Sequence, residues 1–275
     1  MTDLAAVQIR PMLREDVASA STAILEGGWG DRRQSLDFYT RHDACEGVVA
    51  EYRGEIVGTS VTMHSGSVGW LGLVFVARLG AELTRTSLAA LDRLGCTTVL
   101  LAATKLGKPI YDRFEFVEDT GGGYSVWRGP VDQPQPIHPR IRPLKMRDLP
   151  RVYAIDRAAT DEDRAHALRA LANGWVLEDA ECIRGYALRT PWGLGPAVTR
   201  DDDDEQTGMR LLDVLIAHGG SPEVQLIVPT SNDAAARVLA ARGFAERRRL
   251  PRMRRGQPLA WRPRRIWSIF NFAFG

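Results

Sequence analysis

The sequence predicts an α/β protein made of two tandem domains, each with a mixed, mostly antiparallel sheet flanked by helices. Three observations lead to this fold class: an internal repeat, the order of the periodic segments, and a proline-rich segment between the halves. The repeat starts with Ile9-Arg10-Pro11, which recurs 132 residues later as Ile141-Arg142-Pro143. Near the end of each half, Phe116 is matched by Phe244, 128 residues later. Two matches in the same order at nearly the same spacing indicate a duplicated domain.

The boundary between the copies is expected in the segment 129–139, which is rich in proline. Proline removes backbone donors and favours extended conformations, as in a linker. We therefore expect a first domain at 1–130, a linker at 131–139 and a second domain at 140–275 that ends in a basic and apolar tail. A domain of about 135 residues is long enough to bury its own core.

Periodicity gives the same order of elements in both halves. In the first half it predicts a strand at 9–10, helices at 14–25 and 33–41, strands at 47–52, 56–61 and 70–76, a helix at 80–94, a strand at 97–102, a helix at 108–114 and a strand at 116–127. In the second half it predicts helices near 148–159 and 163–172, strands at 175–177, 183–189 and 195–199, a helix at 206–218, a strand at 224–228, a helix at 233–242 and a strand from 244. Gly95 is expected to end the helix at 80–94. This order implies a mixed sheet covered by helices in each half.

The composition is that of a globular protein, with 44% hydrophobic and 25% charged residues among 275. A net charge of +2 gives no reason to expect a nucleic acid or membrane partner. No apolar run approaches the roughly 20 residues that span a bilayer, and the start lacks the pattern of a signal peptide. We therefore expect a cytoplasmic protein.

The three cysteines, Cys45, Cys96 and Cys182, are scattered along the chain. This usage fits a reducing cytosol and predicts neither a disulfide framework nor a metal site. Only three of the 36 basic residues are lysine, which indicates the composition bias of a GC-rich, bacterial genome.

Several stretches of the first half carry a family resemblance. The run 70–76, a helix opened by Gly80, the strand that ends at Ala102 and the segment 107–117 together resemble the GNAT superfamily of N-acetyltransferases. Over nearly the full length the chain is similar to the YitH/HsnT-like tandem group, in which the loop at Gly28-Trp29 also has a match. The matching pieces of the second half are 162–164, 185–189, 195–196, 229–232, 243–244, 252–256 and 266–275.

The resemblance implies an acyltransferase that moves the acetyl group of acetyl-CoA to the amine of a small molecule or peptide by direct attack. A helix N-terminus suits the pyrophosphate of the cofactor, because its amides are unpaired and its dipole is positive there. Backbone groups of a splayed strand at 73–76 would bind the pantetheine arm and the thioester oxygen. The implied cofactor-binding residues are Leu73, Val74, Phe75, Val76, Arg78, Leu79, Gly80, Ala81, Thr104 and Gly107.

Tyr111 takes the place of the tyrosine that protonates the departing CoA thiolate, a role that suits a phenol with a pKa of about 10. The implied substrate-binding residues are Trp29, Asp31, His64 and Asn232. The resemblance implies no metal.

Several positions depart from the family pattern. The loop between Val76 and Gly80 is several residues shorter than in the family, and Arg78 stands where the first glycine of the phosphate loop belongs. Glu115 replaces another usual glycine. In the second half the acidic run 201–205 would repel a pyrophosphate, and Leu239 stands at the position of Tyr111. We therefore expect one acyl-transfer site, in the first half. The alternative is a degenerate GNAT-fold protein that binds a small molecule or acyl-CoA as a regulatory module.

The same residues could instead have structural roles. Tyr111 could be a packing tyrosine, and Gly80 could serve close packing of a helix on a strand. Trp29 could line an amine pocket or cap the core. His64 could relay a proton from the amine or be structural. The acidic run 201–205 is read as a solvated loop, or as a field that favours a cationic amine.

Nine arginines lie between positions 247 and 265. They are expected on a final strand that pairs with surface acids; a site for the CoA 3′-phosphate or a nucleic-acid patch is the alternative. The apolar end 266–274 is expected to dock against a domain or against a second copy in a homodimer.

Overall fold

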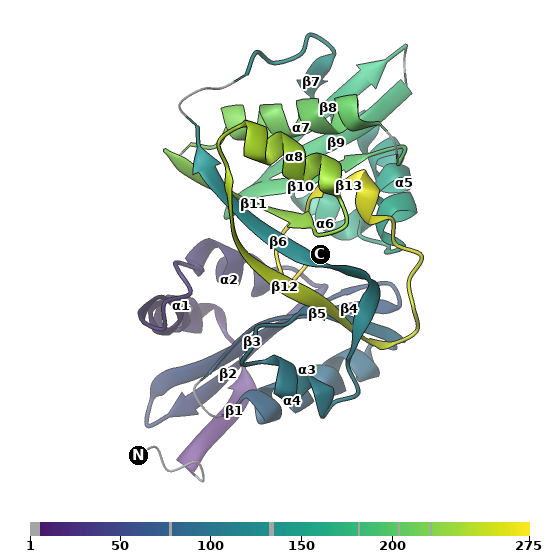
Figure 1. The fold of residues 1–275 in the computed structure, drawn as a ribbon. Helices are drawn as coiled ribbons and strands as arrows, with labels where there is room; N and C mark the ends of the chain where they lie inside the picture. The colour runs from purple at the N-terminus through teal and green to yellow at the C-terminus, as the bar shows by residue number, and fades with distance from the viewer. Residues whose placement is uncertain (1–5, 77–78, 132–134, 181, 203, 221) are drawn as a thin grey trace. The chain divides into compact units, whose positions relative to one another are not determined.

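The computed structural model describes residues 6–76, 79–131, 135–180, 182–202, 204–220 and 222–275. Its elements fall into two compact units (Figure 1). The first unit comprises residues up to Val117 together with Met253–Gln257 and Phe272–Phe274, and the second comprises Glu118–Arg252, Pro258–Asn271 and Gly275. Each unit thus contains segments from the other half of the sequence. The domain boundaries drawn from the linker stay a prediction.

The first unit follows the predicted order of elements. Its elements are β1 (Val7–Pro11), a 3-10 turn (Arg14–Asp16), α1 (Val17–Glu26), α2 (Arg33–Tyr39), β2 (Cys45–Tyr52), β3 (Glu55–Ser65), β4 (Val68–Val76), α3 (Gly80–Arg93), β5 (Thr98–Ala102) and α4 (Lys108–Asp112). The strands run in the order β1-β2-β3-β4-β5, and the pairs are antiparallel except for the parallel pair β4 and β5. The next strand is the end of β12 (Ala245–Gly256), where Thr98 Oγ1 donates to Gln257 O at 2.9 Å. The predicted mixed, mostly antiparallel sheet is confirmed.

Helices cover both faces of this sheet, as the alternation of side chains on β4 indicates. Val74 packs into the apolar clusters below α3, which include Leu83 and Leu88. Its neighbour Phe75 instead contacts the end of α1, where a Cβ on Gly27 would lie 2.1 Å from the Phe75 ring. The strand therefore has α3 on one face and the α1–α2 loop on the other.

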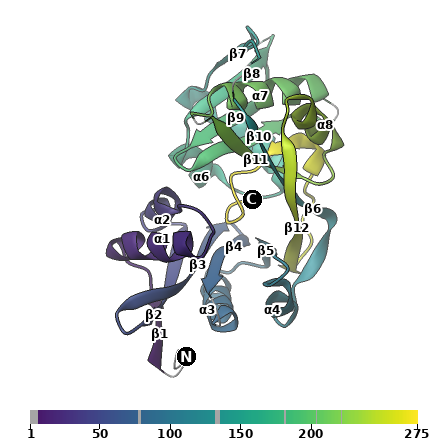
Figure 2. The same ribbon diagram turned by 60° about the vertical axis from the view of Figure 1, so that its left-hand side comes forward.

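The second unit repeats this order of helices and strands (Figure 2). Its elements are β6 (Val117–Pro130), β7 (Ile141–Pro143), α5 (Leu149–Thr160), α6 (Ala165–Ala170), β8 (Gly174–Asp179), β9 (Cys182–Thr190), β10 (Gly193–Thr199), α7 (Glu205–Ala217), β11 (Glu223–Pro229), α8 (Asp233–Ala241), the start of β12, and β13 (Ile266–Ser268). One sheet has the order β13-β10-β9-β8-β7. The unit also contains β6, which pairs antiparallel with β11, while the end of β12 belongs to the first unit. The short strand β13 was not predicted.

The repeated Ile-Arg-Pro sequence forms the same ion-pair latch in both units. Arg10 donates to both carboxylate oxygens of Asp16, at 2.7 and 2.8 Å, and to Glu51 at 2.8 Å. Arg142 donates to Asp148 at 2.7 and 3.0 Å, and to Glu178 at 2.6 Å. The hydrogen bonds from arginine lower the pKa of both aspartates. The repeat thus marks a strand-to-helix connection held by a bidentate pair.

Asp148→Asn is expected to lower the free energy of unfolding at pH 7 by about 1.5–3 kcal/mol, because charge-assisted hydrogen bonds to Arg142 are lost. The folded pKa of Asp148 is lowered, so the stabilisation is present above the unfolded pKa of about 3.9 and is lost as the pH falls through the folded pKa. Denaturant titrations across this pH range measure it. Asp179→Asn is the control, since its pair with Arg140 is 48–55% exposed and is expected to contribute less than about 1 kcal/mol. An equal loss of unfolding free energy in both variants would contradict the role of the Arg142–Asp148 pair. So would a difference between Asp148→Asn and the unaltered protein that persists at low pH.

Left-handed residues end several helices. Gly95 has φ +75° just after α3, which confirms the predicted helix end. Glu115 has φ +63° after α4, and Gly243 has φ +79° at the matching position after α8. A non-glycine residue is strained there, which explains the family's glycine at the position of Glu115.

The basic tail is engaged mostly with acids. Within the second unit Arg265 pairs with Asp202 at 3.0 Å, and within the first unit Arg255 pairs with Asp92 at 3.2 Å. Arg252 is 1% exposed and bonds to Asp119. Arg255 of β12 thus pairs with a surface acid as predicted, whereas the Arg252–Asp119 pair is buried and Arg265 lies beyond the strand. In the part of the chain that is described, no helix is long and apolar enough to span a membrane.

Candidate functional site

Strands β4 and β5 of the first unit diverge along their length. Their parallel ladder covers only Val68–Trp70 opposite Thr98–Leu100, whereas β4 continues to Val76. The edge of β4 beyond Trp70 therefore lacks ladder partners on the β5 side. The predicted splay of 73–76 is present in this register. Backbone donors and acceptors on such an edge are available to a ligand.

A β-bulge marks the point where the strands part. The stretch Gly72–Phe75 of β4 lies opposite Thr59–Val61 of β3, so one extra residue is accommodated on β4. Leu73 has φ +48°, and its carbonyl accepts a hydrogen bond from Thr59 Oγ1 at 3.0 Å. Bulges re-aim backbone groups and are frequent beside active sites. No sequence pattern indicates this role of Thr59.

Helix α3 begins close to the bulged strand with an uncapped N-terminus. Gly80 is its first residue and Leu79 its N-cap, and among the described residues no side chain caps the helix. Leu83 N donates to Leu79 O at 3.0 Å, which leaves the preceding amides of the first turn without helical partners. A Cβ on Gly80 would lie 2.7 Å from Ile110 Cδ1, so this glycine also serves close packing of α4 on α3. Arg78 lies outside the described residues.

Tyr111 lies on α4, with its side chain 8% exposed. Its ring packs edge-on to Phe116 at 5.9 Å and belongs to the apolar cluster that Val74 of β4 joins. Burial raises the pKa of Tyr111 to about 12. Among the described residues its hydroxyl has no hydrogen-bond partner. A buried phenol of this kind remains protonated throughout the physiological range.

Thr104 and Gly107 form the turn that holds Tyr111. Gly107 N donates to Thr104 Oγ1 at 3.1 Å, and Lys108 N donates to Thr104 O at 2.9 Å. A Cβ on Gly107 would lie 2.9 Å from the Tyr111 ring. Only a residue without a side chain therefore lets the ring lie this close to the turn.

The predicted substrate residues lie in different places. Trp29 is 38% exposed and contacts Phe75 of β4 edge-on at 5.8 Å. Asp31 accepts from Arg33 N at 2.8 Å and Ser21 Oγ at 3.0 Å, and these bonds lower its pKa. His64 pairs with Gly69, three residues along β3 from the Val61–Gly72 pair, or roughly 10 Å at the rise of a strand. The structure thus brings Trp29 to β4, uses Asp31 to begin α2 and places His64 away from the bulge.

Asn232 belongs to the second unit, where it is 2% exposed. Its Oδ1 accepts from Ala235 N at 3.0 Å, and its Nδ2 donates to Arg264 O and Ile266 O at 3.2 and 2.9 Å. It therefore caps α8 and fixes the start of β13.

The corresponding cleft of the second unit is filled by its own chain. β13 pairs with β10, with Ser268 opposite Ala197, and Ile269 N donates to Ile227 O of β11 at 3.0 Å. The Trp267 ring packs so closely on α7 that a Cβ on Gly208 would lie 1.7 Å from it. The first part of the apolar tail, residues 266–269, therefore docks between two strands of the second unit, whereas Phe272–Phe274 belongs to the first unit, where Ala273 packs on Gly72 of β4.

The N-terminus of α7 is also occupied. Asp204 accepts from Thr207 N at 3.1 Å and from Thr207 Oγ1 at 2.8 Å, and it accepts from Arg184 at 3.1 Å. Within the acidic run, Asp202 binds Arg265. Asp202 and Asp204 are therefore structural partners of arginine and threonine side chains, whereas the side chains of Asp201 and Glu205 of the predicted solvated loop stay 50% and 62% exposed, and Asp203 lies outside the described residues. Leu239, at the position of Tyr111, is fully buried.

Comparisons with known proteins agree with this architecture. A family model described as Acetyltransferase (GNAT) domain matches residues 152–268. Among solved structures, a putative acetyltransferase from Pyrococcus horikoshii is similar over 100% of this chain and 98% of its own, with 21% identity and a TM-score of 0.82. A tandem GNAT protein from the clavulanic acid biosynthesis pathway is similar over 91% of this chain and 98% of its own (14% identity, TM-score 0.65), and a GCN5-related N-acetyltransferase from Sphaerobacter thermophilus over 93% and 98% (15% identity, TM-score 0.62). No curated protein matches. The chain therefore has the fold of tandem GNAT proteins and carries a GNAT acetyltransferase domain match in its second half.

Proposed function

We propose that the protein is an N-acetyltransferase that carries the acetyl group of acetyl-CoA to the amine of a small molecule or peptide, at one site in the first unit. The observation that carries the proposal is the combination of a splayed, bulged β4 with the uncapped N-terminus of α3. A splayed strand offers backbone groups to the pantetheine arm, and a free helix N-terminus suits a pyrophosphate. The match of residues 152–268 to the GNAT domain lies in the second unit, so it supports the family of the duplicated domain, while the site itself rests on β4 and α3 of the first unit.

The proposed reaction requires few side chains. The amine nitrogen attacks the thioester carbonyl carbon, and the carbonyl oxygen takes negative charge. When the C–S bond breaks, the sulfur leaves with the electron pair and takes a proton, while the nitrogen loses one to solvent. In this proposal, backbone amides at the bulge beside Leu73, where φ is +48°, stabilise the oxyanion.

Tyr111 supplies the proton to the departing sulfur in this proposal. With a pKa raised to about 12 by burial, it is protonated at neutral pH. Full transfer to a thiolate of ordinary pKa, about 8.5, would be uphill on its own. We therefore infer that the proton moves as the C–S bond breaks, while negative charge builds on sulfur.

The first unit is favoured over the second because the same two features differ between them. In the part of the chain that the structure describes, the α3 N-terminus has no side-chain cap, whereas Asp204 caps α7. In the second unit β13 lies beside β10, at the place where β4 of the first unit has its free edge. We infer that the second unit acts as a scaffold and binds no acyl-CoA.

A pair of glycine variants tests the cofactor site. Gly80→Glu is expected to weaken acetyl-CoA binding by at least about tenfold, because it places a carboxylate at the positive end of the α3 dipole, where the pyrophosphate would lie. Gly80→Ala introduces the same Cβ beside Ile110 without the charge and is the matched control. Isothermal titration of both variants measures the difference. Equal affinities in the two variants would remove the α3 N-terminus from the cofactor site.

A further inference from the structure

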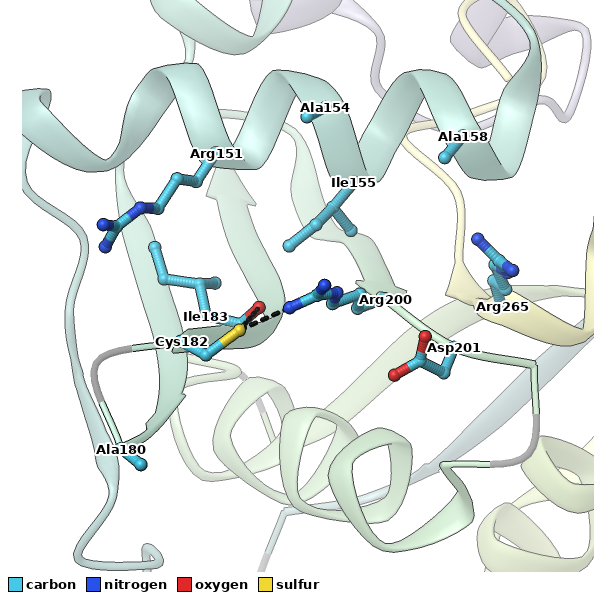
Figure 3. Close-up of a pocket in the computed structure, with 10 residues that line it drawn as sticks. All are labelled: Arg151, Ala154, Ile155, Ala158, Ala180, Cys182, Ile183, Arg200, Asp201 and Arg265. Carbon is cyan, nitrogen blue, oxygen red and sulfur yellow. Dashed lines mark hydrogen bonds between the residues drawn. The ribbon is translucent and has the colours of Figure 1, made fainter.

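The second unit contains a cavity of about 490 Å³ beneath helix α5 (Figure 3). It lies between α5, the start of β9 and the residues that follow β10. Small-molecule sites commonly have volumes of about 300–1,000 Å³. The cavity is therefore large enough for a compact organic ligand, and none of the residues assigned to acetyl transfer lines it.

The wall formed by α5 is apolar. Ala154 and Ala158, which are exposed and one turn apart, line the cavity together with the buried Ile155. Ile183 of β9 adds a further apolar side chain. Methyl groups at two exposed helix positions leave space that longer polar side chains would fill, and they favour an apolar ligand body.

A guanidinium group points into this apolar space. Arg200 extends toward Cys182, and its Nη1 donates to the Cys182 sulfur (Figure 3). A thiol is a weak acceptor, so this contact satisfies the guanidinium poorly. Among the described residues no carboxylate pairs with Arg200.

Two of the other charged groups at the cavity form ion pairs with residues outside its lining, and Arg151 of α5 is a further arginine at its edge. Asp201 pairs with Arg184 at 3.1 Å, and Arg265 pairs with Asp202 at 3.0 Å. The charge of Arg200 is therefore not compensated by these acids. An anion that enters the cavity would meet the donors of Arg200 beside an apolar wall.

We propose that this cavity binds a small carboxylic acid with a short apolar body. The carboxylate accepts two parallel hydrogen bonds from Arg200, and the hydrocarbon part lies against Ala154, Ala158 and Ile155. The planar guanidinium matches a carboxylate in this bidentate geometry. The site belongs to the unit in which we place no acyl transfer, so it is an additional binding site of the protein and does not depend on the proposed enzyme activity.

Titration of the full chain with three probes tests the chemistry of the ligand. Hexanoate is expected to bind at least about tenfold more tightly than hexanamide, which lacks the charge, and than acetate, which lacks the apolar body. Absence of hexanoate binding, or equal affinity for hexanoate and hexanamide, would overturn the proposal.

Three variants place the binding in this cavity. Arg200→Gln is expected to weaken hexanoate binding by about tenfold or more, since it removes the charge-assisted pair. Arg157→Gln, on the exposed face of the same helix and outside the cavity lining, is the control and should bind as the unaltered protein does. Ala154→Leu fills the apolar part and should also weaken binding. Hexanoate binding that survives both Arg200→Gln and Ala154→Leu would show that it occurs elsewhere and would contradict the assignment.

Discussion

Tyr111→Phe is expected to lower kcat for acetyl transfer by about 10²–10⁴-fold, the range for loss of a general acid. The affinity for acetyl-CoA should hardly change, because phenylalanine keeps the ring contacts with Phe116 and Gly107. The variant should also fold as the unaltered protein does, because the Tyr111 hydroxyl has no partner among the described residues to lose. Steady-state rates with acetyl-CoA and a panel of amines, together with calorimetric binding, separate these effects.

Two further measurements sharpen this prediction. Because burial raises the pKa of Tyr111 to about 12, ionisation of the phenol should not reduce the rate up to roughly pH 10. Tyr153→Phe, a half-buried tyrosine of α5, is the matched control and should leave kcat unchanged. An unaltered kcat in Tyr111→Phe would assign Tyr111 to packing alone.

Arg164→Met is expected to lower the free energy of unfolding of the second unit by about 3–5 kcal/mol, the cost of leaving a buried charge unpaired. Arg164 is 2% exposed and donates to Asp156 at 2.9 and 2.5 Å. Tyr186 donates to the same carboxylate. Arg164 also donates to Gly275 O at 2.9 Å and lies over the Phe270 ring at 5.2 Å, so the loss would also release the tail.

Arg237→Met is the control for this variant. Arg237 pairs with Glu205 at 3.0 Å, but the two side chains are 64% and 62% exposed, so less than about 1 kcal/mol should be lost. Denaturant unfolding of both variants measures the contrast. A loss for Arg164→Met as small as that for Arg237→Met would contradict a structural role for the buried pair.

Local sequence patterns were sufficient for most elements of the fold. The helix at 80–94 and the strand at 70–76 agree with α3 and β4 to within two residues, because their apolar spacing reports burial directly. The repeated Ile-Arg-Pro also indicated two equivalent local structures, because Arg10 and Arg142 each pair with an aspartate a few residues further along the chain. The predicted fold class is confirmed by the sheets and by the similarity to tandem GNAT structures.

Long-range pairings could not be read from the sequence. Met253–Gln257 joins the first unit and β13 fills the second unit's cleft, although each segment by itself is only a short apolar or basic run. Periodicity carries no information on which strand becomes a neighbour across more than a hundred residues. The same holds for Asp204, which cannot be recognised as a helix cap until the start of α7 is known.

Residues of the candidate site could be named from the sequence, but their spatial arrangement could be predicted only in part. Trp29, Tyr111 and Gly80 could be named from the resemblance, but the raised pKa of Tyr111 depends on burial, which one position in a sequence does not reveal. The bulge at Leu73 and its bond from Thr59 need the register of two strands. The assignments of individual site residues stay predictions until variants are measured.

The most direct test of the account is the stoichiometry of acetyl-CoA binding to the full chain, measured by calorimetric titration. We expect one molecule of acetyl-CoA per chain, because β4 and α3 of the first unit offer a free edge and a free helix N-terminus, while β13 and Asp204 occupy the equivalent places in the second. Two molecules per chain would contradict the closed second unit. No binding at millimolar acetyl-CoA would contradict the acetyltransferase itself.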